Sequence, residues 1–498
     1  MNQALDFLVT LLRGGLGNLA AYLAAHVLLC LLPAFYIAGA MTALIPKASV
    51  TRFLGRNTPK WIAYPAAALA GSVLAVCSCT IVPLFAGIYK KGAGLGPAIT
   101  FLFFAPAANI LALVYTGGVI GTDLALARLF LSLAFGIGIG LIMALLFRKA
   151  DIAHDQATDA LFAAQGQQMR RTALAFLVLL VVLLLAGTFK VSLLTRSYAQ
   201  ITLPIAGTDA LQSTLARLIP YDATKGQEGV TVQGMLLIVL LGLIGLASWK
   251  GIESIYEGFN AWTWIALGLV ELTLLVAALG MDPQAAGLQV NLTGRFFGVL
   301  LALGALSLLF FKGLEEDDRR EWLWESWRFI KQIFPLLVAG VFVVGMLRVL
   351  IQPEWIEALA GHNTLLGNLA GVLFGVFMYF PTLVEVPIAN MFLSLGMHRG
   401  PLLAYLMADP ELSLQSILMI SAIIGRRKAW TYVAWVTLFS TLAGLIYGAW
   451  IDGVALGLLA LYLALGLALL ALALWWVDRG SRFVSRRPQP VPVPVEKE

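Results

Sequence analysis

Residues 75–109, "AVCSCTIVPLFAGIYKKGAGLGPAITFLFFAPAAN", decide the fold, because their pattern of prolines and glycines returns further along the chain. Residues 379–413, "YFPTLVEVPIANMFLSLGMHRGPLLAYLMADPELS", carry several of the same prolines and glycines 304 positions later. Proline fixes one backbone dihedral and glycine permits turns that other residues avoid. The shared spacing therefore predicts two copies of one structural unit.

The amino-acid composition indicates whether water or lipid surrounds the protein. Of 498 residues, 60% are apolar and 12% are charged, and the mean hydropathy is +0.88. A soluble protein carries about a quarter charged residues, whereas many apolar runs here reach the roughly 20 residues that cross a bilayer. The sequence predicts an all-α polytopic membrane protein whose surroundings are lipid. The net charge of +6 fits basic loops between spans, so no nucleic-acid partner is expected.

The repeat divides the chain into five regions. Pairs of identical residues, from Gly71 with Gly375 to Gly140 with Gly444, recur at the same offset of 304 positions without a gap. We place transmembrane repeat one at 26–147 and transmembrane repeat two at 329–451. Residues 1–25 form an N-terminal amphipathic segment. Residues 148–328 hold a cytoplasmic loop, four central transmembrane helices and a connector. Residues 452–498 form a last transmembrane helix and a disordered cytoplasmic tail.

Basic residues predict that the two repeats face opposite ways. Repeat one is basic in its loops at 47–60, 90–91 and 148–149, whereas repeat two is basic at the turn 426–428. Positive loops stay on the cytoplasmic side, which predicts a cytoplasmic C-terminus. The expected outer loop 190–231 also holds four basic residues, but a loop of that length constrains orientation weakly.

This orientation requires one segment per repeat to enter and leave on the same side. The candidates are 61–89 and 367–395, each apolar but broken near its middle. Counting them as re-entrant hairpins gives about 11 crossings plus two hairpins. Inverted repeats with broken helices are the plan of many secondary transporters, in which the breaks form the substrate site.

The first hairpin carries a possible thiol site at Cys77, Ser78 and Cys79, followed by Pro83. In an extended segment, residues two apart face the same side, and two thiolates there prefer Cu(I), Zn and similar soft species. Proline also leaves the carbonyl of Cys79 without its helical partner. The sequence predicts Cys77 and Cys79 as metal or metalloid ligands, with packing of three small residues as the alternative.

The second hairpin lacks cysteines and carries acids. Glu385, Asp409 and Glu411 are predicted as ion-coupling groups, because ionisable residues inside apolar spans are costly and usually functional. Further substrate-binding candidates are Asn109 and its partner in the repeat, Ser413. Asp123 and Arg128 are expected to pair near one end of a span. The predicted structural hinges are the prolines and glycines of the breaks: Pro106, Pro387, Pro410, Gly92, Gly96, Gly396 and Gly400.

The stretches beginning at Cys77 and Pro381 resemble the two signature regions of the predicted-permease family that includes the ArsP-type organoarsenical exporters. Cys77, Cys79 and Pro83 match the first, and Glu385, Pro387 and Pro410 match the second. The resemblance covers the repeats and implies an inner-membrane permease. In this family some members are linked to export of trivalent organoarsenicals and others to copper or zinc efflux.

These observations predict a secondary-active exporter of a thiophilic metal or metalloid species, with the proton as a possible coupling ion. The alternatives are a permease for a small anion or another small solute, in which the cysteines only pack, and a membrane scaffold that transports nothing. A phosphate-binding loop and the common hydrolase motifs are absent from the sequence, so we expect neither an enzyme nor a cofactor. The sequence leaves the oligomeric state open.

Overall fold

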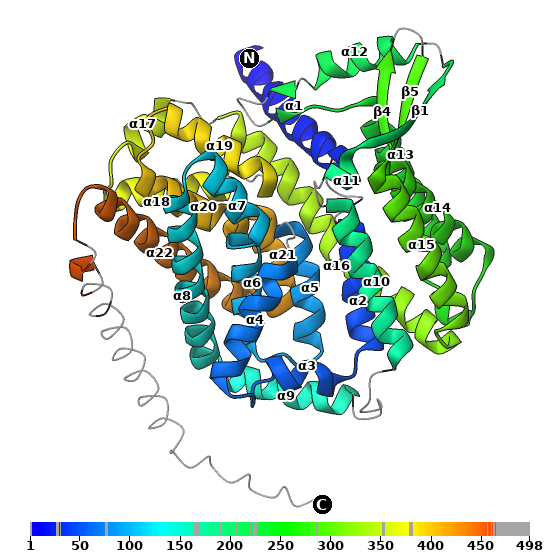
Figure 1. Ribbon diagram of the computed structural model, residues 1–498, viewed down its shortest axis with the longest axis horizontal. Helices are drawn as coiled ribbons and strands as arrows, with labels where there is room; N and C mark the ends of the chain where they lie inside the picture. Colours follow the sequence, from blue (N-terminus) through cyan, green and yellow to red (C-terminus); the bar gives the residue numbers. More distant parts are fainter. Residues whose placement is uncertain are drawn as a thin grey trace, which may run out of the picture.

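The computed structural model describes residues 2–25, 29, 31–74, 78–162, 170–188, 192–205, 207–219, 221–222, 227–284, 287–350, 354–377, 382–455, 457–459, 461 and 464. Most of them are helical, and the long helices run between two ends of the molecule (Figure 1). Helices α3 (Lys47–Leu54) and α9 (Arg148–Phe162) lie at one end, and α17 (Glu354–Ala360) lies at the other. We call these the α3–α9 end and the α17 end.

The two repeats have the same helices at the same spacing. Corresponding boundaries of the last five helices agree within one residue when repeat one is shifted by 304 positions. In repeat one these are α4 (Lys60–Leu74), α5 (Ser78–Lys90), α6 (Leu95–Ala107), α7 (Ile110–Val119) and α8 (Thr122–Leu146). In repeat two they are α18 (Leu365–Phe377), α19 (Thr382–Ser394), α20 (Arg399–Leu412), α21 (Leu414–Ile424) and α22 (Arg426–Ile451). Before them stand α2 (Leu32–Leu44) with α3, and α16 (Glu316–Arg348) with α17.

Two equivalent backbone hydrogen bonds show that the broken segments are hairpins. The amide of Gly94, after α5, donates to the carbonyl of Leu54, before α4, at 2.8 Å. The amide of His398, after α19, donates to the carbonyl of Ala360, before α18, at 2.9 Å. Both ends of each helix pair therefore lie together. Hairpin one (α4–α5) starts from the α3–α9 end and hairpin two (α18–α19) from the α17 end, so the repeats are inverted (Figure 1).

Each hairpin is followed by a bent span and a long helix. Helices α20 and α21 meet at an angle of 46°, and α6–α7 is its counterpart in repeat one. The long helices pack closely on the first half of each bent span. A Cβ on Gly140 or on Gly444 would lie 2.6 Å from the carbonyl oxygen of Gly96 or Gly400, respectively. Gly96 and Gly400 thus lie in the first turns of α6 and α20, where the long helices pack closely on them.

The middle of the chain adds four long helices beside the repeats (Figure 1): α10 (Arg171–Thr188), α13 (Val232–Gly251), α14 (Ala261–Ala278) and α15 (Gly294–Lys312). Their connections at the α17 end form an antiparallel sheet in the order β1-β5-β4, with the remaining short elements beside it. These are α11 (Ser192–Thr195), β1 (Ser197–Leu203), α12 (Thr208–Leu218), β2 (Tyr221–Asp222), β3 (Gln227–Glu228), β4 (Gly280–Gln284) and β5 (Gly287–Thr293). The turn η3 (Ile255–Glu257) joins α13 to α14.

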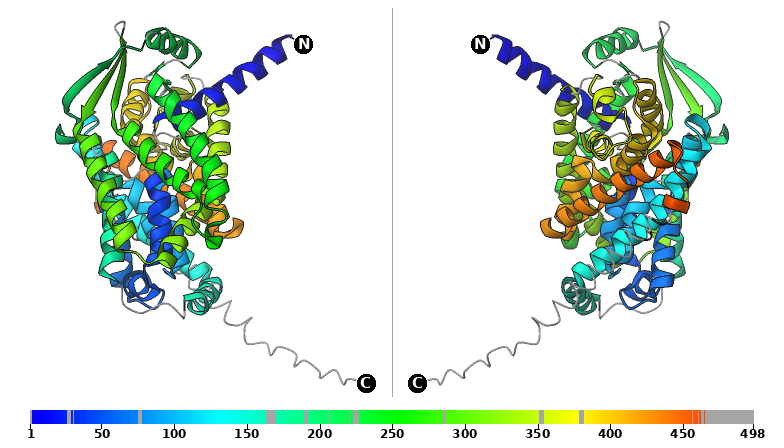
Figure 2. Two further views of the ribbon diagram at one scale, coloured as in Figure 1. Left: turned by 90° about the vertical axis from the view of Figure 1, so that its right-hand side faces the viewer. Right: turned by 90° about the vertical axis from the view of Figure 1, so that its left-hand side faces the viewer.

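Helix α1 (Asn2–Ala25) projects from the body near the α17 end, where it packs on α13 and α16 (Figure 2). It is apolar and long enough to cross a bilayer, although the sequence predicts an amphipathic segment there.

The described helices include eight that can cross a membrane, or nine with the bent pair α20–α21 counted as one span. Large apolar side chains point outward along them, such as Leu126 and Phe130 on α8, Val178 on α10 and Leu301 on α15. Such an apolar exterior needs lipid around it. The chain is an all-α polytopic integral membrane protein. Most of the predicted last span and the whole tail lie outside the described residues.

Candidate functional site

A fully buried ion pair joins the two repeats. Arg128 on α8 of repeat one donates from Nη2 to Oε1 and Oε2 of Glu385 on α19 of repeat two, at 3.0 and 3.3 Å. Both side chains have no exposed surface. A charge buried without its partner costs several kcal/mol, about 3–5 in measured cases. The pair therefore holds hairpin two firmly against repeat one.

The break in the first bent span supplies further partners of Arg128. Its Nε donates to the carbonyl of Ala107 at 2.6 Å, and Nη1 donates to the hydroxyl of Thr116 at 3.4 Å. Ala107 is the last residue of α6, and the last carbonyls of a helix lack intrahelical partners. The guanidinium thus satisfies a helix end, while Asn109 begins the next helix by accepting from the amide of Ala112 at 2.8 Å.

Repeat two has a different polar pair at the equivalent place. Positions 128 and 107 correspond to Tyr432 and Glu411 at the 304 offset. The Tyr432 hydroxyl donates to Oε2 of Glu411 at 2.6 Å. Each long helix therefore sends a polar side chain to the break of its own bent span. Arg128 and Tyr432 each lie six residues after the start of their helix, about 9 Å along the axis, so the two pairs lie at different depths.

The other predicted residues of this break are also buried. Asp409 has no exposed surface, and its backbone packs on Gly375 of α18. Ser413 caps α21 and donates to the Ser416 hydroxyl at 2.7 Å. Pro410 lies two residues before the end of α20. The structure thus gathers Asp409, Glu411 and Ser413 at one break.

At the α17 end, Asp123 pairs with Arg399 and not with Arg128, which corrects the expectation from sequence. Arg399 Nη1 lies 3.0 Å from Oδ2 of Asp123, and the Tyr447 hydroxyl donates to the same oxygen at 2.7 Å. Both ion-pair partners are about one-third exposed. This tie again joins α8 of repeat one to helices α20 and α22 of repeat two.

At the α3–α9 end, the base of hairpin one is tied to three other elements. Lys428 of α22 donates to the Tyr89 hydroxyl at 3.2 Å, and His154 of α9 stacks on the Tyr89 ring with centroids 4.1 Å apart. Lys90 pairs with Glu325 of α16 at 2.9 Å. The following turn contains Gly92, whose φ of +88° matches the +89° of Gly396 in repeat two.

The predicted thiol site is described only in part. Cys77 lies outside the described residues, and the side chains of Ser78 and Cys79 are not described. Helix α5 already begins at Ser78 and contains Pro83, so Ser78 and Cys79 are helical, whereas the sequence reasoning placed them in an extended segment. Pro83 is the sixth residue of α5 and lies inside the helix, so it has no amide to donate to the carbonyl of Cys79. Within the described part of the chain, no three His, Cys, Asp or Glu residues form a metal-binding group.

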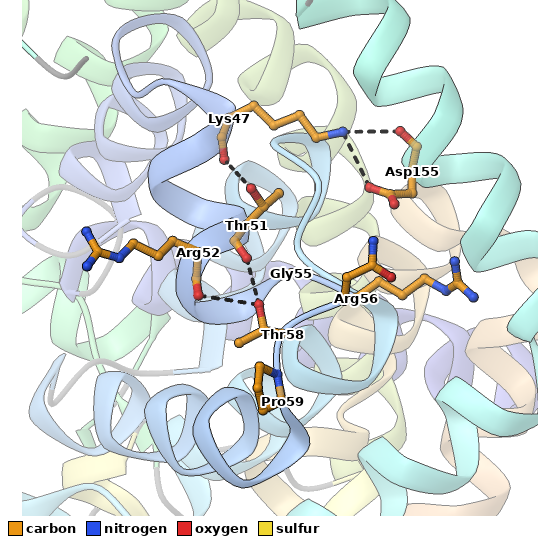
Figure 3. A pocket seen from close by; sticks show the side chains of 9 residues that line it. Lys47, Thr51, Arg52, Gly55, Arg56, Thr58, Pro59 and Asp155 are labelled. Carbon is orange, nitrogen blue, oxygen red and sulfur yellow. Dashed lines mark hydrogen bonds and ion pairs between the residues drawn. The ribbon is translucent and has the colours of Figure 1, made fainter. Parts of the chain in front are cut away.

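A cavity of about 350 Å³ opens at the α3–α9 end, between α3, the turn before α4, and α9 (Figure 3). Lys47 reaches across it to Asp155, 3.1 Å from its carbonyl and 3.4 Å from its carboxylate. The guanidinium groups of Arg52 and Arg56 lie on opposite sides (Figure 3). The cavity therefore presents an ion-paired wall and no converged set of donors, and it lies apart from the buried pairs between the repeats.

Known proteins match nearly the whole chain. The predicted permease family ArsP_1 matches residues 14–449. The chain belongs to this family. The UPF0718 protein MJ0584 of Methanocaldococcus jannaschii is 30% identical over 450 residues, which cover 90% of this chain and 98% of that protein. The UPF0718 protein YraQ of Escherichia coli K12 is 29% identical over 118 residues, 24% of this chain and 34% of that protein. No solved structure shows a significant match to this permease.

Sequence reasoning missed the partners of Glu385 and Glu411. It assigned Arg128 a structural role and did not single out Tyr432. A signal was present, because Arg128 is a charged residue in an otherwise apolar span, where charges are rare and usually functional. The 304 offset also pairs it with Tyr432, which marks both as side chains that serve the same break.

Proposed function

We propose that this permease is a secondary-active exporter of a thiophilic metal or metalloid species, either a trivalent organoarsenical or copper or zinc. Cys77 and Cys79 bind the substrate transiently, and a proton is the coupling ion. The observation that carries the proposal is the buried Arg128–Glu385 pair between two inverted repeats with broken helices. Family membership supports transport as such, and the soft-ligand chemistry of thiolates suggests the substrate class.

The proposed orientation follows from the basic loops. The α3–α9 end carries Lys47, Arg52, Arg56 and Lys60, and the first turn of α22 adds Arg427. Loops rich in Lys and Arg remain in the cytoplasm, so this end faces the cytoplasm of a bacterial-type inner membrane, as does the C-terminus. Hairpin one then opens its base toward the cytoplasm, where an exporter collects its substrate.

The buried ion pair gives hairpin two a defined docked position. In this position Glu385 is neutralised by Arg128 on the other repeat. Movement of hairpin two away from α8 exposes both charges, so the movement needs a group that replaces one of them. A proton on Glu385 or the charge of a substrate beside Arg128 meets this need. Alternating access then proceeds by movement of each hairpin against the opposite repeat.

A resistance and uptake experiment tests the substrate class. Cells that express the wild type should survive organoarsenicals, copper or zinc better than cells that lack the permease, and Cys77→Ser/Cys79→Ser should remove the protection. The matched control is Cys30→Ser, the third cysteine, which has no role in the proposal and should keep it. A double variant that protects as well as the wild type would exclude thiol ligation.

The second candidate function is a small-anion permease, and the buried guanidinium of Arg128 is the observation that favours it. Its guanidinium has five N–H donors and no acceptor, and a small anion is the natural replacement for Glu385 as its partner. In that case Cys77→Ser/Cys79→Ser keeps full transport, whereas Arg128→Lys reduces it because lysine lacks the planar set of donors. The two candidates thus give opposite results with the cysteine variant.

A further inference from the structure

Glu411 is a buried acid without a cationic partner. It is 2% exposed and lies at the end of α20. Tyr432 donates to its Oε2 at 2.6 Å, while Oε1 has no hydrogen-bond partner among the described residues. Its surroundings therefore differ from those of Glu385, which has the guanidinium of Arg128 on both oxygens.

The neighbouring helices offer no free positive charge to Glu411. Arg128 is engaged by Glu385 and Ala107, and Lys428, one turn before Tyr432, donates to Tyr89. Helices α6, α8, α18, α19, α21 and α22 pack against α20. The other ionisable residues on these helices and on α20 are acids and phenols, the partly exposed pair at the α17 end, and the exposed start of α22. They are Glu385, Asp409, Tyr405, Tyr447, Asp123, Arg399, Arg426 and Arg427.

An ionised carboxylate in this position has a high cost. Burying a charge without a counter-ion costs several kcal/mol even after relaxation, and a buried acid avoids this cost by holding a proton. A single hydrogen bond from a neutral phenol compensates only part of it.

We propose that Glu411, held by Tyr432, carries the exchangeable proton of the transport cycle. Glu385 is then the fixed counter-ion of Arg128, and the coupling role predicted for three acids narrows to one. The coupling part of this inference rests on the proposed function. In the conformation shown, the Glu411 carboxyl is neutral, and it releases its proton to the solvent or to the transported species when the repeats rearrange.

The inverted symmetry explains how rearrangement reaches this proton. Arg128 contacts Glu385 of hairpin two, and the equivalent contact of the mirrored state pairs Tyr432 with Ile81 of hairpin one, which corresponds to position 385 at the 304 offset. Ile81 is in the first turn of α5, next to the candidate thiol segment. Movement of hairpin one against α22 therefore shifts Tyr432 and changes its hydrogen bond to Glu411.

Amide variants test the proton without any transport measurement. Glu411→Gln replaces a neutral acid by a neutral amide, so its thermal unfolding midpoint in lipid nanodiscs should match that of the wild type. Glu385→Gln leaves Arg128 unpaired and should lower the midpoint. In infrared spectra, the wild type should show the carbonyl band of a protonated carboxylic acid that is lost in Glu411→Gln. An unchanged band in that variant would overturn the proposal.

Proton-driven transport tests the coupling. In proteoliposomes with an imposed pH gradient, Glu411→Gln should lose the gradient-dependent part of transport, while Glu354→Gln, an exposed acid on α17, keeps it. Full gradient dependence in Glu411→Gln overturns the coupling role. If the wild type transports no thiophilic species, the proposed substrate class fails, and the infrared band still decides whether Glu411 holds a proton.

Discussion

Removing one partner of the Arg128–Glu385 pair is predicted to destabilise the permease far more than removing both. Neither side chain has exposed surface, so each single variant leaves a charge buried without its partner. Arg128→Met and Glu385→Gln should each cost about 3–5 kcal/mol of unfolding free energy. The double variant leaves two neutral side chains and should be considerably more stable than the sum of the single losses implies.

The size of the coupling can be worked from the contacts. Arg128→Met also removes the bond to the carbonyl of Ala107, which is worth about 1 kcal/mol. That loss occurs in both the single and the double variant, so a double-mutant cycle cancels it. The remaining interaction energy between Arg128 and Glu385 should be about 3 kcal/mol, against about 0.5 kcal/mol or less for independent sites.

The assay is a denaturant titration of the purified permease in lipid nanodiscs or detergent, which measures the free energy of unfolding of each variant. The Asp123–Arg399 pair provides the matched control, because it also joins the repeats but is about one-third exposed. A double-mutant cycle on this control pair should give an interaction energy of about 1 kcal/mol or less. Additive losses at Arg128 and Glu385 would show that the ion pair does not hold hairpin two, and the proposed docking would then be wrong.

Three further predictions concern packing, pH and orientation. Gly140→Ala should cost about 1–3 kcal/mol, because the added Cβ meets a carbonyl oxygen of α6 at 2.6 Å, whereas Gly304→Ala has open space around it; thermal unfolding of both variants checks this. Burial lowers the pKa of Lys91 to about 8, so the folded state loses this proton before the unfolded state as the pH rises. Stability should therefore increase between pH 8 and 10.5 by up to about 3 kcal/mol, and this increase should vanish in Lys91→Met when unfolding is measured across that range. In whole cells, a membrane-impermeant thiol reagent should label Glu354→Cys and leave Lys60→Cys unlabelled, and the reverse result would invert the proposed orientation.

The helices of the repeats could be predicted from sequence because prolines and glycines determine the backbone locally. The turn at Gly92 and its counterpart at Gly396 have φ values of +88° and +89°, a region that favours glycine. Helix boundaries then recur at the same offset whatever the side chains between them. The hairpins were predicted for a related reason, since two apolar segments broken near their middle and the opposite charge patterns of the repeats favour a chain that returns to the side it left.

The ion pairs could not be predicted because their partners are far apart in the sequence. Arg128 and Glu385 are 257 positions apart, and nothing local indicates that they meet. The nearer pairing of Asp123 with Arg128 fails for a geometric reason. Residues five apart on a helix point about 140° away from each other, and only residues three or four apart are neighbours. Asp123 therefore faces α20 and α22, while Arg128 faces the break of the bent span.

The two repeats share a backbone but not charges, and this difference makes the two end states of the proposed transport cycle unequal in free energy. Docking of hairpin two on α8 forms an ion pair in a medium of low dielectric. The mirrored state, with hairpin one docked on α22, brings Ile81 toward Tyr432 at the equivalent place and forms no ion pair. The two states then differ in free energy, although their backbones are related by symmetry. A ligand shifts such an equilibrium only by its differential affinity for the two states. In the proposed cycle, the proton on Glu411 and a substrate at hairpin one both act away from the Arg128–Glu385 pair, and they have to supply that differential affinity.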